Sequence, residues 1–523
     1  MLALDLGTSG AKAAVFTRTG RAVGLAFRPT TLRLLPGGGA EQDPADWWEA
    51  TLGACRECLQ APGVERARIA SLAVTGQWSG TVAVDSAGQP LRPALIWMDS
   101  RGAPEVGRIA GSTFGLLPYS VPRLLRWVAL TGGAPGKSGK DALAHILYLR
   151  QSEPALYAQT RYFFEPKDYL NFRLTGVAAA GYDSIALHWV TDNRRIDQVD
   201  YEPSLLRLAG IEREKLPPLL QPESELGTLL PAVAEQLGLR PDVRVALGAP
   251  DVHATAIGSG AVGNHRPHLY VGTSSWLSCH VPFKKTDVLH NLASLPAALA
   301  GRYLLINEQE CAGACLTQLK DHILFPDEAG QTPRSSFAEL DRLAALAPPG
   351  SDNLLFLPWL YGERSPVEDH RLRGGFFNYS LGATRAHLVR AVLEGIAQNA
   401  RWLLGYAERF AGQSFDHVRL VGGGGKSKLW AQIYADVLDR PVQLCADPEL
   451  ASLRGVAALA FGALGECSSE AFAERVPVLE TLEPRRELRG MYDELYAAFL
   501  GYYANNRRWL ARLNRTGGQH AGL

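Results

Sequence analysis

The sequence predicts a mixed α/β protein built from two similar halves. Segments with the alternating pattern of β-strands and segments with the three-to-four spacing of helices take turns along the chain. This order indicates layered α/β structure. A strand, a Gly-Thr-Ser turn and a second strand occur near residue 7 and again near residue 272. A chain of 523 residues has room for roughly two to four domains. Repetition of one unit therefore favours a duplicated architecture.

The composition is that of an ordinary globular protein, with 46% hydrophobic and 20% charged residues. Basic and acidic residues number 53 each, so the net charge is zero and no basic stripe indicates a nucleic-acid partner. No stretch has the length and apolarity of a membrane span, and the start of the chain lacks the basic region of a secretory signal. We therefore expect a cytoplasmic protein with no nucleic-acid or membrane partner.

The first predicted element is a β-hairpin at the N-terminus. Leu2, Leu4 and Leu6 alternate with smaller or polar residues, Gly7–Gly10 breaks the pattern, and Ala13–Phe16 resumes it. The chain returns to the same layout much later.

The second copy begins with the strand-like residues His268–Val271. The turn Gly272–Ser275 follows, and Trp276–Val281 has the pattern of a strand.

The Gly-rich segment Gly258–Pro267 is the natural boundary between the halves. We expect an N-terminal domain over residues 1–258, a C-terminal domain over residues 264–515 and a flexible tail over residues 516–523.

Further strands and helices are predicted between and after the two hairpins. Strands are expected at Ile69–Val74, Thr81–Val84, Val243–Leu247 and Val418–Val421, and helices at Val252–Ile257, over residues 387–404 and from residue 427 onward.

The hairpin turns have the composition of phosphate-binding loops. Glycines let backbone N–H groups approach an anion, and Thr and Ser hydroxyls add donors. Lys12 follows the turn and can meet a transferring phosphoryl group, while Asp5 precedes it and can hold Mg²⁺. A plain turn is the alternative. The second copy at Gly272–Ser275 favours a pair of loops that bind the phosphates of a nucleotide.

Two other Gly-rich runs invite nucleotide-binding motifs. Gly422–Ser427 is not a P-loop, because the pattern would require Gly at position 420, which is Leu420. Two interpretations of this run remain. It is either a helix N-terminus free of bulky side chains, where a base or ribose could pack, or a plain Gly-rich turn. Gly258–Gly263 matches G-x-G-x-x-G, but a strand and not a helix follows, so we interpret it as a chance match.

Asp251 is the best candidate for a general base. It follows the predicted strand Val243–Leu247 on a tight loop, where a carboxylate can accept the proton of a substrate hydroxyl during phosphoryl transfer. An N-cap for the helix at Val252–Ile257 is a compatible alternative. His253 is expected to be a packed or capping residue and not a metal ligand, because no second His or Cys lies at metal-ligand spacing from it.

Two short loops combine aromatic and polar residues in the way that sugar sites do. Thr75–Gly80 and Ile96–Arg101 both place a Trp beside polar side chains. The alternative is that these Trp residues belong to the core.

Together these motifs resemble the FGGY family of carbohydrate kinases, and most nearly its xylulokinase-like branch. The resemblance runs almost from end to end. Its motifs are Leu4–Gly10, Glu165–Leu170, Leu174–Gly176, Leu357–Pro366, Arg373–Phe377, His387–Gly395 and Leu450–Ala460.

The resemblance implies an actin-like ATPase fold, with two duplicated ribonuclease-H-like domains and a cleft between them that closes over ATP, Mg²⁺ and a sugar. It implies Asp251 as catalytic base and substrate contact, Asp5 on the metal side, and a possible homodimer. The implied nucleotide contacts are Gly7, Thr8, Ser9, Gly10, Lys12, Gly272, Thr273, Ser274, Gly313, Gly423, Gly424 and Ser427. The implied sugar-side residues are Gln77, Trp78, Ser79, Asp99 and Arg101.

The chain departs from the family pattern at the sugar side. Trp78 and Ser79 stand where xylulokinases usually have Met and His, and Val252 stands where they usually have Asn. The Gly-rich segment Leu130–Lys140 also departs. A ketopentose such as xylulose is the expected substrate, with another ketose, a polyol or a sugar acid as alternatives. A non-transferring ATPase and a sugar sensor on the same fold are the rival functions.

Overall fold

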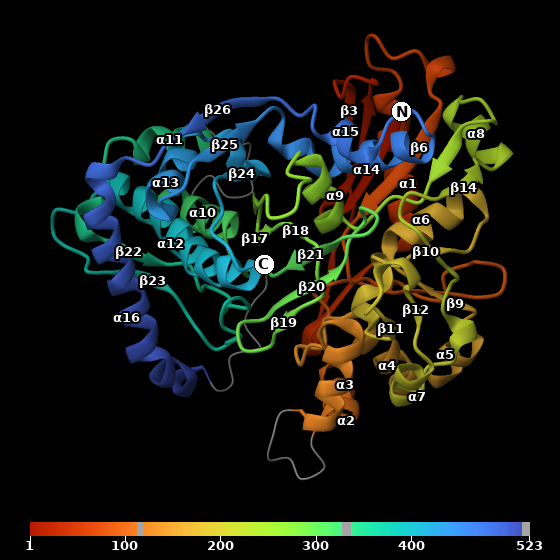
Figure 1. The fold of residues 1–523 in the computed structure, drawn as a ribbon, viewed down its shortest axis with the longest axis horizontal. Helices are drawn as coiled ribbons and strands as arrows, with labels where there is room; N and C mark the ends of the chain where they lie inside the picture. Colours follow the sequence, from red (N-terminus) through yellow and green to blue (C-terminus); the bar gives the residue numbers. More distant parts are fainter. Residues whose placement is uncertain (112–118, 327–335, 515–523) are drawn as a thin grey trace.

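The computed structural model describes residues 1–111, 119–326 and 336–514, so the predicted tail at 516–523 lies outside the described residues. Two large sheets, each flanked by helices, lie in different halves of the molecule (Figure 1). The first sheet has the order β14-β15-β6-β1-β2-β3, and the second has the order β17-β16-β24-β25-β26.

The strands of the first sheet are β1 (Leu2–Gly7), β2 (Gly10–Phe16), β3 (Ala22–Pro29), β6 (Ser71–Gly76), β14 (Glu225–Thr228) and β15 (Arg244–Ala246). Those of the second are β16 (His268–Val271), β17 (Ser275–Ser278), β24 (Val418–Val421), β25 (Val442–Cys445) and β26 (Val478–Leu482). The shorter strands are β4 (Arg33–Leu35), β5 (Gly39–Gln42), β7 (Val82–Val84), β8 (Ala94–Leu95), β9 (Tyr162–Phe164), β10 (Ala180–Gly181), β11 (Thr191–Asp192), β12 (Asp200–Tyr201), β13 (Leu219–Leu220), β18 (His280–Val281), β19 (Thr286–Asp287), β20 (Leu292–Pro296), β21 (Tyr303–Ile306), β22 (Leu355–Leu357) and β23 (Gly375–Phe377).

The helices of the first half are α1 (Pro44–Cys58), α2 (Ala103–Ala110), α3 (Val121–Thr131), α4 (Ala142–Ser152), α5 (Pro154–Gln159), α6 (Pro166–Thr175), α7 (Pro203–Ala209), α8 (Pro231–Leu237) and α9 (Asp251–Gly258). Those of the second are α10 (Gly313–Leu319), α11 (Phe337–Ala344), α12 (Arg385–Ala411), α13 (Lys428–Leu438), α14 (Ala451–Ala463), α15 (Ser469–Ala473) and α16 (Arg489–Leu513). Within the described ranges, no helix is long and apolar enough to cross a membrane.

The two large sheets repeat the same strand pairing. In the first, β1 and β2 form an antiparallel hairpin, and β1 also pairs in parallel with β6. In the second, β16 and β17 form the hairpin, and β16 pairs in parallel with β24. A further parallel strand follows in each sheet, β15 beside β6 and β25 beside β24. This repetition confirms the predicted duplicated α/β architecture.

Most predicted elements occur where the sequence places them, with two differences. The predicted strand Trp276–Val281 is two strands, because β17 pairs with β16 and β18 pairs with β21 in a different sheet. The predicted helix over residues 387–404 lies inside α12, which runs for 27 residues. Its buried residues continue beyond the predicted end as far as Ala411, so packing against the core extends the helix.

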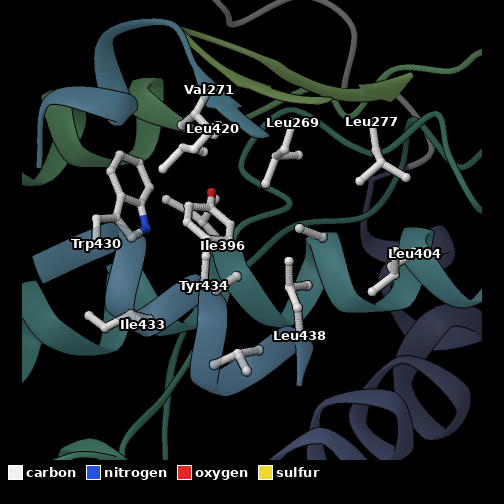
Figure 2. Packing of buried hydrophobic residues seen from close by; sticks show 14 of the residues in the cluster. Leu269, Val271, Leu277, Ile396, Leu404, Leu420, Trp430, Ile433, Tyr434 and Leu438 are labelled. Atoms are coloured by element: carbon white, nitrogen blue, oxygen red, sulfur yellow. The ribbon is translucent and has the colours of Figure 1, made fainter. Parts of the chain in front are cut away.

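The core of the second half shows why the helical spacing was informative. Leu269 and Val271 of β16 face α12 and α13, and Ile396 of α12 lies beside Trp430 and Tyr434 of α13 (Figure 2). Apolar residues three and four positions apart lie on one face of a helix, so each helix buries one continuous stripe against the sheet. This packing fixes the N-terminus of α13, where the Gly-rich run ends.

Helices α9 and α14, which come from different halves of the sequence, cross at two glycines. A Cβ atom on Gly258 would lie 1.7 Å from the Ala451 carbonyl oxygen, and one on Gly455 would lie 1.8 Å from the Ala254 carbonyl oxygen. Only glycine permits this backbone contact. The Arg454 Nη1 atom also donates to the Gly258 carbonyl oxygen at 3.2 Å.

Helix α14 belongs to the second half of the sequence but packs on the first sheet. The hydrophobic core beside the first sheet therefore contains residues from both halves of the sequence. Leu453 and Val456 of α14 lie in one cluster with Ala3 of β1 and Ala73 of β6. The boundaries at residues 258 and 264 stay a prediction.

Replacing Gly455 with Ala is expected to destabilise the protein by about 2 kcal/mol or more, because the added methyl group overlaps backbone and not a flexible side chain. The matched control is Gly405→Ala in α12, where a Cβ would have nothing within 4 Å. That change should stabilise by about 0.5–1 kcal/mol, as Gly→Ala does in an exposed helix. Chemical denaturation of both variants checks the prediction, and equal stabilities would contradict it.

Candidate active site

The first hairpin presents a charged pair beside its turn. Asp5 and Lys12 are cross-strand partners in the β1–β2 register, and the Lys12 Nζ atom lies 3.8 Å from the Asp5 carboxylate. Ser452 of α14 donates a hydrogen bond of 2.8 Å to the same carboxylate. Helix α14 therefore positions the carboxylate that the sequence singled out for a metal ion.

A closed set of hydrogen bonds joins the turn to the sugar-side loops. Thr8 Oγ1 donates to Gln77 Oε1 at 3.1 Å and accepts from Trp97 Nε1 at 2.8 Å. Gln42 Nε2 donates to the Thr8 carbonyl oxygen at 2.8 Å, and Gln42 Oε1 accepts from Gln77 Nε2 at 2.8 Å. Because the Thr8 hydroxyl is used in this way, the Gly7–Gly10 turn is left with its backbone N–H groups and Ser9 for an anion.

The second hairpin lies against the start of α10. The Gly313 N–H donates to the Gly272 carbonyl oxygen at 2.8 Å, and the Ala312 N–H donates to the Thr273 carbonyl oxygen at 2.9 Å. A Cβ on Gly313 would lie 2.5 Å from the Gly272 oxygen, so the contact needs glycine. The structure thus brings three residues predicted to contact nucleotide to one place.

The third Gly-rich segment opens helix α13. The Ser427 hydroxyl accepts the Trp430 N–H at 3.0 Å and is the N-cap of the helix. A Cβ on Gly423 would have nothing within 4 Å, whereas Gly424 is buried against Val271. Open space at Gly423 beside a helix N-terminus suits a nucleotide, as the sequence suggested.

Asp251 is the first residue of α9, and Pro250 is the N-cap, so the N-cap alternative for Asp251 is wrong by one position. Its Oδ1 atom accepts the Val252 N–H at 2.8 Å. Burial and the nearby Asp5 carboxylate raise the pKa of Asp251 to about 8, and the cation of Lys12 opposes the shift.

Two buried side chains of α6 fix the loop that leads to Asp251. Asn171 Nδ2 donates to the Leu247 carbonyl oxygen at 2.7 Å, and Lys167 Nζ lies 3.4 Å from the same oxygen. Lys167 and Asn171 are four positions apart on one helix face. Helix α6 therefore positions the backbone four residues before the candidate base.

The sugar-side residues that depart from the family pattern already bond to protein. Trp78 Nε1 donates to the Ser184 carbonyl oxygen at 2.8 Å, and its ring meets the edge of His253 at 5.0 Å between centroids. The Ser79 hydroxyl donates to the Lys140 carbonyl oxygen at 2.9 Å. What Trp78 can offer a sugar is therefore ring surface. His253 is buried, as predicted.

Asp99 and Arg101 bind each other. Arg101 Nη2 lies 2.6 Å from Asp99 Oδ2 and 2.5 Å from Glu41 Oε1. The Ala40 N–H donates to Asp99 at 2.9 Å, and Asp99 is 0% exposed. In this arrangement Asp99 has no accessible atom for a sugar, and its role there stays a prediction.

Sequence reasoning missed a set of polar residues that gathers around these loops. Gln42 and Ser452 are two of them, and Lys140, Glu308, Glu310 and Arg364 form an ionic group. One signal was present: the polar run Asn307–Glu310 directly follows the apolar strand β21.

Comparisons with known proteins agree with this geometry. The family model described as the FGGY family of carbohydrate kinases, N-terminal domain, matches residues 1–258, and the corresponding C-terminal domain matches residues 269–464. The chain is 29% identical to the xylulose kinase of Staphylococcus epidermidis, over 98% of both chains. It is 28% identical to the xylulose kinase of Bacillus subtilis, over 95% of this chain and 96% of that one.

A solved structure, xylulose kinase from Rhodospirillum rubrum, superposes with a TM-score of 0.81 at 28% identity, over 98% of this chain and 99% of that chain. The likeness confirms the predicted actin-like architecture with two duplicated domains. Both domain models match in the expected order, and the relatives align over almost their whole length. The chain therefore belongs to the FGGY family of carbohydrate kinases and is an ATP-dependent sugar kinase.

Proposed function

We propose that this kinase transfers the γ-phosphoryl group of ATP to a hydroxyl of a ketopentose such as xylulose. Relatives named xylulose kinase align with the chain almost from end to end, which supports the choice of sugar. The observation that carries the mechanism is the position of Asp251. It is half-buried near the Asp5–Lys12 pair of the first hairpin, and the Trp78 loop contacts the same helix through His253.

In the proposed reaction, Asp251 accepts the proton of the sugar hydroxyl as the hydroxyl oxygen forms a bond to the γ-phosphorus of ATP. The bond from that phosphorus to the β,γ-bridging oxygen breaks, and ADP leaves. Backbone N–H groups of the two Gly-Thr-Ser turns and the cation of Lys12 bear the charge on the phosphoryl oxygens. Closure of the two halves would exclude water as a competing acceptor.

The side chains present fit a magnesium ion that arrives with ATP. Asp5 supplies the hard carboxylate oxygens that Mg²⁺ prefers, and the hydrogen bond from Ser452 holds this carboxylate in place. Over the described residues, no group of three or more His, Cys, Asp or Glu side chains could hold a metal ion alone. ATP phosphates and water would therefore complete the shell. Bound there, Mg²⁺ would neutralise charge on the phosphates.

A second candidate is a kinase of another ketose, a polyol or a sugar acid. It is favoured by the bonding of Trp78 and Ser79 to protein and by Val252, which packs against the same buried cluster as Ile306 of β21. These side chains would contact the sugar with the aromatic ring of Trp78 and with methyl groups, and not through hydrogen bonds. Homodimer formation and a cytoplasmic location also stay predictions.

The test of the substrate is sugar-stimulated ADP release over ketopentoses, other ketoses, polyols and aldonates. Xylulose is expected to raise the rate most, as judged by kcat/KM. A larger kcat/KM for a sugar of another class would replace xylulose with that sugar and leave the kinase assignment intact.

Replacing Asp251 with Asn is expected to lower kcat by about 10²- to 10⁴-fold, because the amide keeps the shape of the carboxylate but cannot take a proton. The KM for ATP should stay within about threefold, since the base acts on the other substrate. Steady-state kinetics with both substrates varied gives these values. A variant that retains wild-type kcat would remove Asp251 from the role of base.

The pKa of Asp251 also predicts the pH dependence. Because burial and Asp5 raise it to about 8, the carboxyl carries a proton at lower pH and cannot accept another. With both substrates below saturation, the rate should rise about tenfold per pH unit up to a break near 8, then level off.

Asp5→Asn should move this break to lower pH, because it removes the negative charge that opposes ionisation of Asp251. Lys12 and Glu308 also face Asp251 with charges of opposite sign, and both remain in that variant. A level profile from about pH 6 to about pH 9 in the unaltered enzyme would contradict the assignment.

A further inference from the structure

Four charged side chains form an ionic cluster where the two halves meet, here called the charged cluster: Lys140, Glu308, Glu310 and Arg364. Lys140 precedes α4 in the first half, whereas Glu308 and Glu310 follow β21 and Arg364 follows β22 in the second. Lys140 Nζ lies 3.8 Å from Glu310 Oε1, and Arg364 Nε lies 2.7 Å from the same oxygen. Arg364 also pairs with Glu308.

The two carboxylates of the charged cluster differ in what surrounds them. The Glu310 side chain is 4% exposed, and its backbone N–H donates to the buried Glu363 carboxylate at 3.0 Å. The Glu308 side chain is 27% exposed, more than Arg364 at 19% or Lys140 at 14%. Glu310 is therefore a fixed internal partner, whereas Glu308 presents accessible carboxylate surface.

Glu308 also lies among the groups assigned to the reaction. The Ser274 side chain of the second hairpin is close enough to its carboxylate to oppose the rise in the pKa of Glu308 that burial causes. Its negative charge is close enough to Asp251 to raise the pKa of that residue. The Lys140 carbonyl oxygen, in turn, accepts the hydroxyl of Ser79 on the sugar-side loop. Glu308 is thus near the second phosphate-side turn and the candidate base, and its cluster is joined to the sugar-side loop through Lys140.

Two alternative roles for Glu308 fit less well. A metal ligand would need to lie in one group with Asp5 and a further ligating side chain, yet the part of the chain that the structure describes holds no group of three side chains able to bind a metal ion. A partner for an anionic sugar would need excess positive charge, but Lys140 and Arg364 are already matched by two carboxylates. An accessible carboxylate instead accepts strong hydrogen bonds from neutral hydroxyl groups.

We propose that Glu308 is a specificity-determining residue that accepts a hydrogen bond from a hydroxyl of the sugar, other than the one that is phosphorylated. Arg364 and Lys140 orient it across the boundary between the halves. The inference rests on the proposed function. It narrows the substrate to a neutral polyhydroxylated compound, a ketose or a polyol, and disfavours sugar acids.

The test is the kinetics of Glu308→Gln beside a matched control, Glu225→Gln. Glu225 is 32% exposed and pairs with Arg244 at 3.0 Å, so the control removes an Arg-paired carboxylate of similar exposure on β14. Glu308→Gln should raise the KM for the sugar by about 10- to 100-fold, the effect expected when a hydrogen bond to a charged group is weakened. The KM for ATP should stay within about threefold, and the control should match the unaltered enzyme.

Two further measurements separate binding from folding. Glu308→Asp keeps the charge and should recover part of the sugar affinity, which a merely structural role would not predict. Monodeoxy analogues of the best sugar should include one that the unaltered enzyme and Glu308→Gln use equally well, because the hydroxyl that Glu308 contacts is missing. Thermal melting checks that each variant folds.

Three results would overturn the inference. An unchanged KM for the sugar in folded Glu308→Gln would do so, as would a change confined to the Mg²⁺ requirement or the KM for ATP. A preference of the unaltered enzyme for aldonates over neutral sugars would also overturn it. If the unaltered chain neither binds nor phosphorylates any sugar in the panel, the proposed function fails with it; if only the variant effect is missing, the proposed function stands.

Discussion

The contact between helices α9 and α14 is the constraint on which the candidate active site depends. Gly258 and Gly455 let the two backbones touch, and no side chain could replace either without moving a helix. The contact sets two functional positions at once. Asp251 begins α9, and Ser452, at the start of α14, hydrogen-bonds to Asp5 on β1. Parts of the chain separated by about two hundred residues therefore share one rigid frame.

Around that frame, hydrogen bonds make the first phosphate turn and the sugar-side loop a single unit. Gln42 is wholly buried and joins the Thr8 carbonyl to the Gln77 amide, while Trp97 donates to the Thr8 hydroxyl. Every group in this set has a partner, which favours a fixed arrangement. A turn held in this way can present its backbone N–H groups to a phosphate without reorganisation.

The electrostatics of the site follow from burial more than from net charge. Two carboxylates, Asp5 and Asp251, act on each other with Lys12 nearby, and their limited exposure reduces screening by solvent. The charged cluster places equal numbers of cations and anions nearby. A balanced site of this kind holds a neutral sugar by hydrogen bonds, and its charges act on the phosphoryl group and the transferred proton.

The sequence by itself determined the duplicated α/β fold, the two Gly-Thr-Ser turns and the position of Asp251 after a strand. These features depend on residues that are neighbours along the chain, since turn chemistry and hydrophobic period are local properties. Only the tertiary structure decided that Thr8 is already bonded, that Asp99 is enclosed by Arg101, and that Glu308 lies near Asp251. Such contacts join segments far apart in sequence, and they depend on how the halves pack, which no local pattern encodes.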